Sequence, residues 1–430
     1  MRVTFFNRDI ETAERELLEA RQVKRLQTML RQVLATNGFY RQKLGEAGLD
    51  RAEDIRSLDD LRRLPFTIKH ELVEDQAAHL PFGTNLTFPL EQYIRLHQTS
   101  GTTGRPLRWL DTPESWNWWA RCWGAVYRGA GVGPGDRVFF AFSFGPFIGF
   151  WSAWEGTRWV DALAISGGAQ NSEQRLHHLL ETEATAICCT PSYALHLAEV
   201  ARENGLDIAA SSVQRLIVAG EPGANIPATR RRIEEAWNAQ LFDHTGATEV
   251  GAHGFECLAH AGVHLNEGEF IVEVIDPTTG EPADEGELVI TNLGRVGMPI
   301  IRYRTGDQVR LARERCECGR TFVRMEGGII GRIDDMFIVR GVNVFPSAIE
   351  NIVRSFPQVD EFAIEVYKRG EMDELELKIE ALADDPQAVA QAVQAEMERR
   401  LAFRVPVHAV EAGSLPRWEL KARRVVDRRR

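Results

Sequence analysis

Long apolar runs and an excess of positive charge are both missing from this sequence of 430 residues. No stretch approaches the roughly 18 uninterrupted apolar residues of a membrane-spanning helix. The first residues carry acidic side chains from Asp9 onward and no long apolar core, so the start does not resemble a secretory signal. Asp and Glu number 62 against 51 Lys and Arg. The resulting net charge of −11 disfavours general binding to nucleic acid or to anionic membranes.

Cysteine is also scarce, with six residues in the whole chain. So low a number disfavours a disulfide framework and is typical of a reducing compartment, so we expect a cytoplasmic protein. Cys188 and Cys189 lie in a short apolar run and are predicted to be core residues.

The remaining composition is that of an ordinary globular protein, with 44% hydrophobic and 26% charged residues. A chain of this length exceeds one core, so two or more domains are expected. Apolar residues recur at helical spacing over about 9–48, and from about 137 to 245 apolar strands alternate with helices. This alternation predicts an α/β fold in which a parallel sheet is covered by helices on both faces.

The pattern changes near Gly262, where two strands around an exposed turn indicate a β-rich, antiparallel subdomain over about 262–330. The elements expected after it are a helix at 346–355, strands at 361–368 and 373–380, a helix at 386–402 and a strand at 404–411. The sequence therefore predicts an N-terminal domain over 1–332 and a small, mobile α+β domain over 333–430.

One loop is rich in glycine and in hydroxyl-bearing side chains, since Thr99–Pro106 reads TSGTTGRP. Such residues occur in ordinary surface turns. They also occur in loops that wrap phosphate, because missing side chains let backbone N–H groups approach the anion. Composition alone does not separate the two interpretations, and the GxxxxGK[ST] pattern of a Walker loop is absent.

Four further motifs follow this loop in order: FDHTGATEVG at 242–251, YRTGD at 303–307, GRIDDMFIVRGVNVFPSAIE at 331–350 and LPRWELKARRVVD at 415–427. Together they resemble the adenylate-forming enzymes, which include acyl-CoA synthetases, adenylation domains of peptide synthetases and luciferases. MPIIRYRTGD, GVNVFPSAIE and the N-terminal FYRQKLGEAGL are similar to the phenylacetate–CoA ligase-like branch. The resemblance covers essentially the whole chain.

The resemblance implies a two-step reaction. A carboxylate attacks the α-phosphorus of ATP to give an acyl-adenylate and pyrophosphate, and the thiol of coenzyme A then displaces AMP. Because the first step joins two anions, catalysis rests on neutralising charge and on positioning. Lys421 matches the family's catalytic lysine, Glu249 would hold Mg²⁺ on the phosphates, and Thr248 would contact the α-phosphate.

The same resemblance assigns the nucleotide site. The β- and γ-phosphates would bind the loop residues Thr99, Ser100, Gly101, Thr102, Thr103 and Gly104. The adenine side would be formed by Gly220, Glu221, Pro222, Thr245 and Gly246, and the ribose or phosphate contacts by Asp307 and Arg332. Asp334 lies at the family's hinge, about which the C-terminal domain would rotate between the two half-reactions.

Some positions depart from the family pattern. Many relatives have an aromatic residue where this chain has Thr245, so what stacks on adenine stays open. Leu420 stands where glycine usually precedes the lysine, and the basic residue that often follows the loop is here Arg105 or Arg108.

A second group of residues has the chemistry of a metal site. Thiolates and imidazole suit a tetrahedral zinc ion, and some members of the resembled branch carry a structural zinc at such a set. The expected ligands are Cys257, His264 and the CECG pair Cys316 and Cys318, with His260 and His253 as alternatives to His264. The competing interpretation is a reduced pair of cysteines in a surface turn.

The acid would bind near 142–154 and 166–171, where aromatic side chains are dense. Aromatic residues in apolar elements are more often core than pocket, so packing is the competing interpretation. The candidate pocket residues are Phe142, Phe144, Gly145, Phe147, Trp151 and Gly167, and they favour an aryl or arylacetic acid.

Three functions compete at this point. The first is ATP-dependent acid–CoA ligation, and the second is loading of a carrier-protein thiol by a stand-alone adenylation enzyme. The third is non-catalytic nucleotide binding, which loss of Lys421, Glu249 or Asp307 would favour; all three residues are present. No nucleic-acid or membrane partner is expected, and the sequence leaves a homodimer open.

Overall fold

The N-terminal part of the chain folds into a group of helices. The computed structural model describes residues 3–99, 106–333, 337–339, 342–369, 372–401, 403–417 and 424–429. Its first elements are α1 (Arg8–Glu11), α2 (Arg15–Thr36), α3 (Gly38–Glu46), α4 (Leu58–Arg62) and α5 (Lys69–Ala78). The helical spacing over 9–48 is confirmed, with breaks at 12–14 and at Asn37. The Asn37 side chain accepts a hydrogen bond from Tyr40 N and begins α3, because asparagine is favoured at an N-cap.

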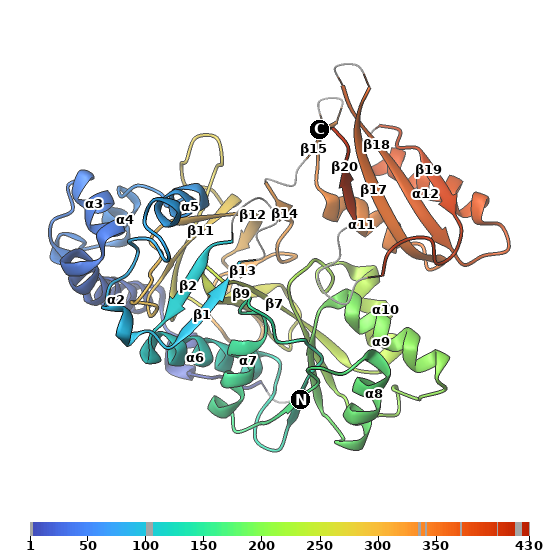
Figure 1. Cartoon of the computed structure of the whole chain (residues 1–430), viewed down its shortest axis with the longest axis horizontal. Helices are drawn as coiled ribbons and strands as arrows, with labels where there is room; N and C mark the ends of the chain where they lie inside the picture. The colour runs from blue at the N-terminus through green and yellow to red at the C-terminus, as the bar shows by residue number, and fades with distance from the viewer. Residues whose placement is uncertain are drawn as a thin grey trace.

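Two short strands frame the glycine- and hydroxyl-rich loop. β1 (Arg95–Gln98) and β2 (Arg108–Asp111) pair antiparallel, with Gln98 opposite Arg108. This hairpin lies next to α6 (Pro113–Gly129), as Figure 1 shows.

The middle of the chain forms the predicted parallel sheet. Its strands are β3 (Arg137–Phe140), β4 (Leu163–Ser166), β5 (Ala186–Cys189), β6 (Arg215–Val218) and β7 (Gln240–Ala247), in the order β4-β3-β5-β6-β7. Its helices are α7 (Trp151–Gly156), α8 (Ser172–Glu181), α9 (Pro191–Glu203) and α10 (Pro227–Trp237). One face of the sheet packs against α6 and the other against α8, α9 and α10. Cys188 and Cys189 are 0% and 1% exposed, so their core role is confirmed.

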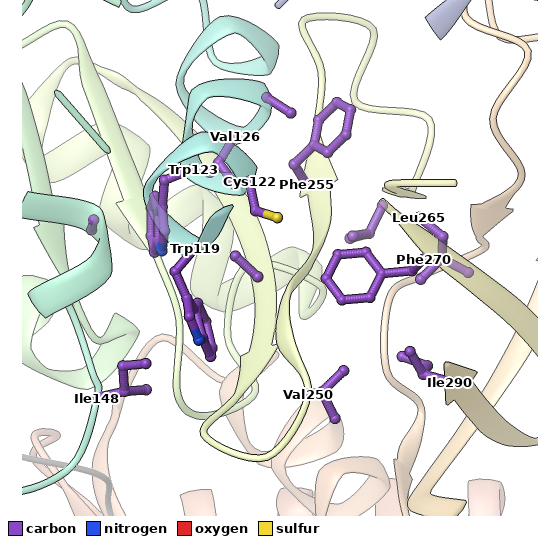
Figure 2. Close-up of a cluster of buried hydrophobic side chains, with 14 of the residues drawn as sticks. Trp119, Cys122, Trp123, Val126, Ile148, Val250, Phe255, Leu265, Phe270 and Ile290 are labelled. Carbon is purple, nitrogen blue, oxygen red and sulfur yellow. The ribbon is translucent and has the colours of Figure 1, made fainter. Parts of the chain in front are cut away.

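The sheet continues into an antiparallel part. This part contains β8 (Gly251–Glu256), β9 (Val263–Leu265), β10 (Phe270–Ile275), β11 (Glu285–Asn292), β12 (Tyr303–Ala312), β13 (Arg324–Met325) and β14 (Gly331–Arg332). Antiparallel pairing begins between β7 and β8, ahead of Gly262, because a tight turn at 248–250 returns the chain along β7. Side chains of α6 and of this part share one core, shown in Figure 2 around Trp119, Cys122, Phe255 and Phe270.

The C-terminal part has its own sheet and its own core. β17 (Val359–Arg369) and β18 (Met372–Ala381) pair antiparallel, with β20 (Val425–Asp427) and β19 (Val407–Val410) at the edges. The helices α11 (Pro346–Arg354) and α12 (Pro386–Leu401) complete the core, and the hairpin of β15 (Phe337–Val339) and β16 (Val342–Val344) precedes them. This unit lies to one side of the larger body, near α10 (Figure 1).

The α/β fold class with a small α+β unit is therefore confirmed. The boundary at 332 and motion between the units stay predictions. Within the described ranges, no helix combines the length and the apolar character needed to cross a bilayer.

Candidate active site

The loop Thr99–Pro106 is closed at its base by hydrogen bonds. Thr99 N donates to Leu107 O at 2.9 Å, and Leu107 N donates to Thr99 Oγ1 at 3.0 Å. Just before the loop, Gln98 N donates to Pro146 O at 2.9 Å, which attaches it to the aromatic segment. The loop residues Ser100, Gly101, Thr102, Thr103, Gly104 and Arg105 lie outside the described residues, so their phosphate contacts stay predictions.

A buried ion pair supports the turn that carries Thr248 and Glu249. Arg295 Nη1 donates to Thr248 O at 2.6 Å and to Glu249 O at 3.4 Å. The other two guanidinium nitrogens of Arg295 donate to the two carboxylate oxygens of Asp111, at 2.8 and 2.7 Å. Both side chains are 0% exposed. Because Asp111 ends β2, this pair joins the β7–β8 turn to the strand that leaves the glycine-rich loop.

A lysine from the N-terminal helices reaches the same turn. Lys69, the first residue of α5, places Nζ 3.4 Å from Glu249 Oε1. Glu249 is buried, whereas the Lys69 side chain is 44% exposed. The Glu249 carboxylate of the turn and the Lys69 ammonium of α5 therefore lie side by side.

Asp307 and Arg332 face each other on β12 and β14. The two residues are in register, and Arg332 Nη1 lies 3.1 Å from Asp307 Oδ1. Tyr303, also on β12, is 4% exposed. Burial raises the pKa of Tyr303 well above its ordinary value, and the Glu249 and Asp307 charges add to that rise while Arg332 opposes it. The charges of Glu249, Asp307 and Arg332 therefore all act on the buried Tyr303 hydroxyl.

The adenine-side candidates lie at the ends of neighbouring strands. Gly220, Glu221 and Pro222 follow β6, while Thr245 and Gly246 lie on β7, which pairs with β6 in parallel. Gly220 has a φ of +95°, a conformation that favours glycine. In the described part of the chain, the buried Thr245 hydroxyl has no hydrogen-bond partner. All five candidates therefore lie at one edge of the sheet.

The aromatic candidates for the acid pocket form one cluster of rings. The Phe142 and Phe144 centroids are 5.6 Å apart, and those of Phe144 and Trp151 are 4.6 Å apart. Trp151 Nε1 donates to Gly145 O at 3.0 Å, and the half-buried Phe147 ring lies against Gly145. Phe142 is 8% exposed and Trp151 37% exposed, so the cluster runs from the core to the surface.

Gly167 has a packing role beside this cluster. A Cβ on Gly167 would lie 2.8 Å from the Phe139 ring and 2.8 Å from Phe140 O, closer than atoms can approach. The backbone there is held by a hydrogen bond from Arg175 Nε to Gly167 O at 2.8 Å.

The four predicted zinc ligands converge. Cys257, His264, Cys316 and Cys318 are all buried, and their ligand atoms lie within 4.8 Å of one another. Cys257 Sγ is 3.8 Å from Cys316 Sγ, and Cys318 Sγ is 3.6 Å from His264 Nε2. Ordinary bond lengths to a tetrahedral zinc ion separate two sulfurs by about 3.8 Å, and a sulfur from an imidazole nitrogen by about 3.6 Å. The residues present therefore fit zinc.

His264 is better placed for this role than either alternative histidine. His264 Nδ1 donates to Phe322 O at 3.3 Å, which directs Nε2 toward the cysteines. His260 instead pairs with Glu256 at 3.2 Å, and His253 Nδ1 bonds Gly251 O at 3.3 Å.

Two predicted residues, Lys421 and Asp334, lie outside the described residues, so their roles stay predictions. The described residues that flank the Lys421 segment are anchored to the C-terminal sheet. Arg417 Nη2 lies 2.8 Å from Glu380 Oε2, and Arg424 Nε lies 2.7 Å from Glu361 Oε1. Glu361 and Glu380 face each other on β17 and β18.

Sequence reasoning missed Lys69, Asp111 and Arg295. Asp111 offered a signal, because a lone acid at the end of the apolar stretch LRWLD suggests a buried partner. Lys69 and Arg295 carried none, since each meets its partner from a distant part of the chain.

Known proteins resemble this chain over most of its length. Residues 341–429 match the family described as AMP-binding enzyme C-terminal domain. The chain is 37% identical over 381 residues to a phenylacetate–coenzyme A ligase of Thermus thermophilus, covering 86% of this chain and 83% of the relative. It is 34% identical over 436 residues to that of Escherichia coli, covering 98% and 97%.

Solved structures give the same result. A 2-hydroxyisobutyryl-CoA ligase in the postadenylation state, in complex with R3-HIB-AMP, aligns with a TM-score of 0.92 at 32% identity. The match covers 99% of this chain and 92% of that one. The same enzyme with 2-HIB-AMP and CoA in the thioesterification state aligns with a TM-score of 0.74, so this chain is arranged more like the postadenylation state. The resemblance read from the motifs is confirmed: the chain belongs to the phenylacetate–coenzyme A ligase family of adenylate-forming acid–CoA ligases.

Proposed function

We propose that this protein uses ATP to convert an arylacetic acid to its acyl-adenylate and then transfers the acyl group to coenzyme A. Adenylate formation followed by thioester formation is the reaction type of its family. The proposal rests on Glu249 in the β7–β8 turn, paired with Lys69, and on the Asp307–Arg332 pair of β12 and β14, because a nucleotide site needs such charges. The proposal goes beyond the family in naming the acid and in assigning a role to each residue.

The phosphate end of the site would combine charges of both signs. Glu249 would hold Mg²⁺ on the phosphates, since a hard cation prefers carboxylate oxygen and water. Lys69, 3.4 Å from Glu249, would offset the negative charge of the phosphates. Thr248 would contact the α-phosphate, and Arg295 would hold the turn in place from beneath.

The acid would lie beside the ring cluster of Phe142, Phe144 and Trp151. Its partial exposure at Trp151 supports access for a substrate ring. A small 2-hydroxy acid is the second candidate, because the relative with the 0.92 TM-score is a 2-hydroxyisobutyryl-CoA ligase. Loading of a carrier protein, a homodimer and a cytoplasmic location stay predictions.

Pyrophosphate exchange over a panel of acids tests this proposal. The panel contains phenylacetate, benzoate, 2-hydroxyisobutyrate and acetate, each without and then with coenzyme A. We expect exchange to be fastest with phenylacetate, and AMP release to become multiple-turnover when coenzyme A is added. Fastest exchange with 2-hydroxyisobutyrate would overturn the arylacetic assignment, and turnover only with a carrier protein would overturn the acceptor.

Asp307→Ala should weaken ATP and AMP binding by about 1–3 kcal/mol, because a charged hydrogen-bond acceptor for the ribose is removed. Calorimetric titration measures this directly. Asp284→Ala is the control, since Asp284 forms an exposed ion pair with Arg313 on the antiparallel part. Nucleotide affinity equal to that of the control would show that Asp307 does not contact the ribose.

We also propose that Cys257, His264, Cys316 and Cys318 bind one structural zinc ion. Four protein ligands close the coordination sphere, so the ion would have no open position for substrate. The ligands span a long stretch of chain, so the ion would stabilise the fold by joining distant segments.

Changing Cys316 and Cys318 to serine together should remove the zinc, about one ion per wild-type chain. The melting temperature should fall clearly, whereas the affinity for ATP should change little, because the zinc ligands are not among the proposed nucleotide-binding residues. Elemental analysis and thermal melts measure the two effects. Cys188→Ser, in the core but outside the ligand set, should lower stability without lowering zinc content. A metal-free wild type of equal stability would contradict the assignment.

A further inference from the structure

The N-terminal segment is fastened to the residues that follow the CECG turn. Arg320 Nε donates to Glu11 Oε2 at 2.6 Å, and Arg320 Nη2 donates to Thr4 O at 2.6 Å. Thr321 N donates to Glu11 O at 2.9 Å, and Thr321 Oγ1 donates to Ala13 O at 2.7 Å. Residues 4–13 are therefore held by a pair of residues placed directly after the ligand turn.

Arg320 also contacts the ligand set itself. Its Nη1 donates to Cys318 Sγ at 3.5 Å, while its guanidinium lies over the rings of Phe5 and Phe255, at 4.7 and 5.3 Å from their centroids. The side chains of Arg320 and Glu11 are 1% and 4% exposed. The cation is thus enclosed between the Cys318 sulfur and the Glu11 carboxylate, where charge interactions are strong.

Glu11 is a junction between Arg320 and the backbone of its own segment. Glu11 Oε1 accepts from Phe6 N and from Asn7 N, each at 2.7 Å, while Oε2 accepts from Arg320. Within the described residues, the hydrogen bonds of this carboxylate go to the N-terminal segment and to the arginine beside Cys318. A change at the sulfur end of Arg320 can therefore reach residues 4–13 through this carboxylate, in addition to the direct contact of Arg320 with Thr4 O.

The net charge expected for the zinc site explains why a cation lies beside it. Three thiolates and a neutral imidazole around Zn²⁺ leave a net charge of about −1 in a buried place. Such a charge is costly unless a cation lies next to it. Within the described residues, Arg320 is the cation whose hydrogen bond to a ligand sulfur is seen.

We propose that Arg320 neutralises the excess negative charge of the metal site and, through Glu11, makes docking of residues 4–13 depend on the metal. The inference rests on the proposed zinc site. Without the metal, the Cys318 sulfur would no longer be held at its ligand position beside Arg320 Nη1, and the hold of Arg320 on Glu11 would weaken.

Zinc affinity and hydrogen exchange of the full chain test this inference. Arg320→Met, which keeps the length but not the charge, should weaken zinc binding about 10- to 100-fold in competition with a chelator. Arg320→Lys should lose less, because it keeps the charge. In the wild type, removing zinc with a chelator should speed exchange of residues 4–13 about tenfold or more, and adding zinc back should reverse this.

Two further variants separate the two halves of the inference. Glu11→Ala should speed exchange of residues 4–13 while zinc affinity stays within about threefold, because Arg320 keeps its contact with Cys318. Arg315→Met is the control: Arg315 is exposed and bonds Gly319 O, so both measurements should stay at the wild-type value. If Arg320→Met does not fold, Arg320→Lys and Glu11→Ala decide the question.

Two results would overturn the inference while leaving the zinc proposal intact. The first is that the wild type binds zinc and the Arg320→Met variant binds zinc with the same affinity. The other is equally slow exchange of residues 4–13 with and without zinc. A wild type that binds no zinc at all would overturn both.

Discussion

Replacing Lys421 with alanine should slow adenylate formation about a hundredfold or more while ATP binding stays nearly intact. A long cationic side chain can neutralise charge that develops as the carboxylate meets the α-phosphate, and removing one such preorganised charge costs about this much. Single-turnover measurement of the acyl-adenylate reports the step directly. Thioester formation from preformed adenylate should change far less, because the lysine would act in the first half-reaction.

The control for Lys421 is Lys378→Ala in the same C-terminal unit. Lys378 pairs with Glu365 at 2.7 Å on the C-terminal sheet, and its loss removes a lysine without touching the proposed site. Adenylate forming at a rate close to wild type in the Lys421 variant would show that another group supplies the charge, with Lys69 as the first candidate.

The second large effect is expected from Arg295→Met. This change leaves the Asp111 carboxylate buried without its cation, which typically costs about 3–5 kcal/mol of unfolding free energy. The melting temperature should fall by about 5 °C or more. Adenylate formation should slow as well, because the turn of Thr248 and Glu249 loses two hydrogen bonds. Arg313→Met, which removes an exposed ion pair with Asp284, should leave the melting temperature almost unchanged.

The pH dependence of the Arg295→Met variant has a definite sign. Burial raises the pKa of Asp111, and the Arg295 charge opposes that rise, so the variant raises this pKa further. The folded state then holds a proton that the unfolded state releases, and stability falls as pH rises. The deficit relative to wild type should therefore be larger at about pH 8 than at about pH 5. Asp111→Asn combined with Arg295→Met should recover much of the loss, and a deficit independent of pH would contradict this account.

The local fold could be read from the sequence because its signals are local. Alternating strands and helices with proline at first turns, as at Pro191 in α9, gave the parallel sheet. The start of antiparallel pairing was misplaced, because the reversal occurs in a turn of three residues at 248–250 that carries no glycine or proline. A short turn of this kind has no compositional signature.

The residues of the candidate site also fall into those marked by local sequence and those that depend on distant contacts. Motif residues such as Glu249 and Asp307 were found because their neighbours in sequence mark them. Arg295 was not, because its role arises from a contact with Asp111, which is distant in the chain; the lone acid at Asp111 signals a buried partner but does not identify it. The zinc ligands are intermediate: the CECG turn is visible in the sequence, whereas the choice of His264 over His260 depends on which histidine faces the sulfurs. Arg320 became noticeable only through its contact with Cys318.

The central claim is tested most directly by following products in two stages. Enzyme, ATP, Mg²⁺ and phenylacetate are first mixed without coenzyme A, and coenzyme A is then added. We predict pyrophosphate and enzyme-bound phenylacetyl-adenylate in equal amounts in the first stage, and phenylacetyl-CoA and AMP in equal amounts in the second. Release of ADP and phosphate, or pyrophosphate formation only after coenzyme A is added, would contradict the proposed order of the two half-reactions.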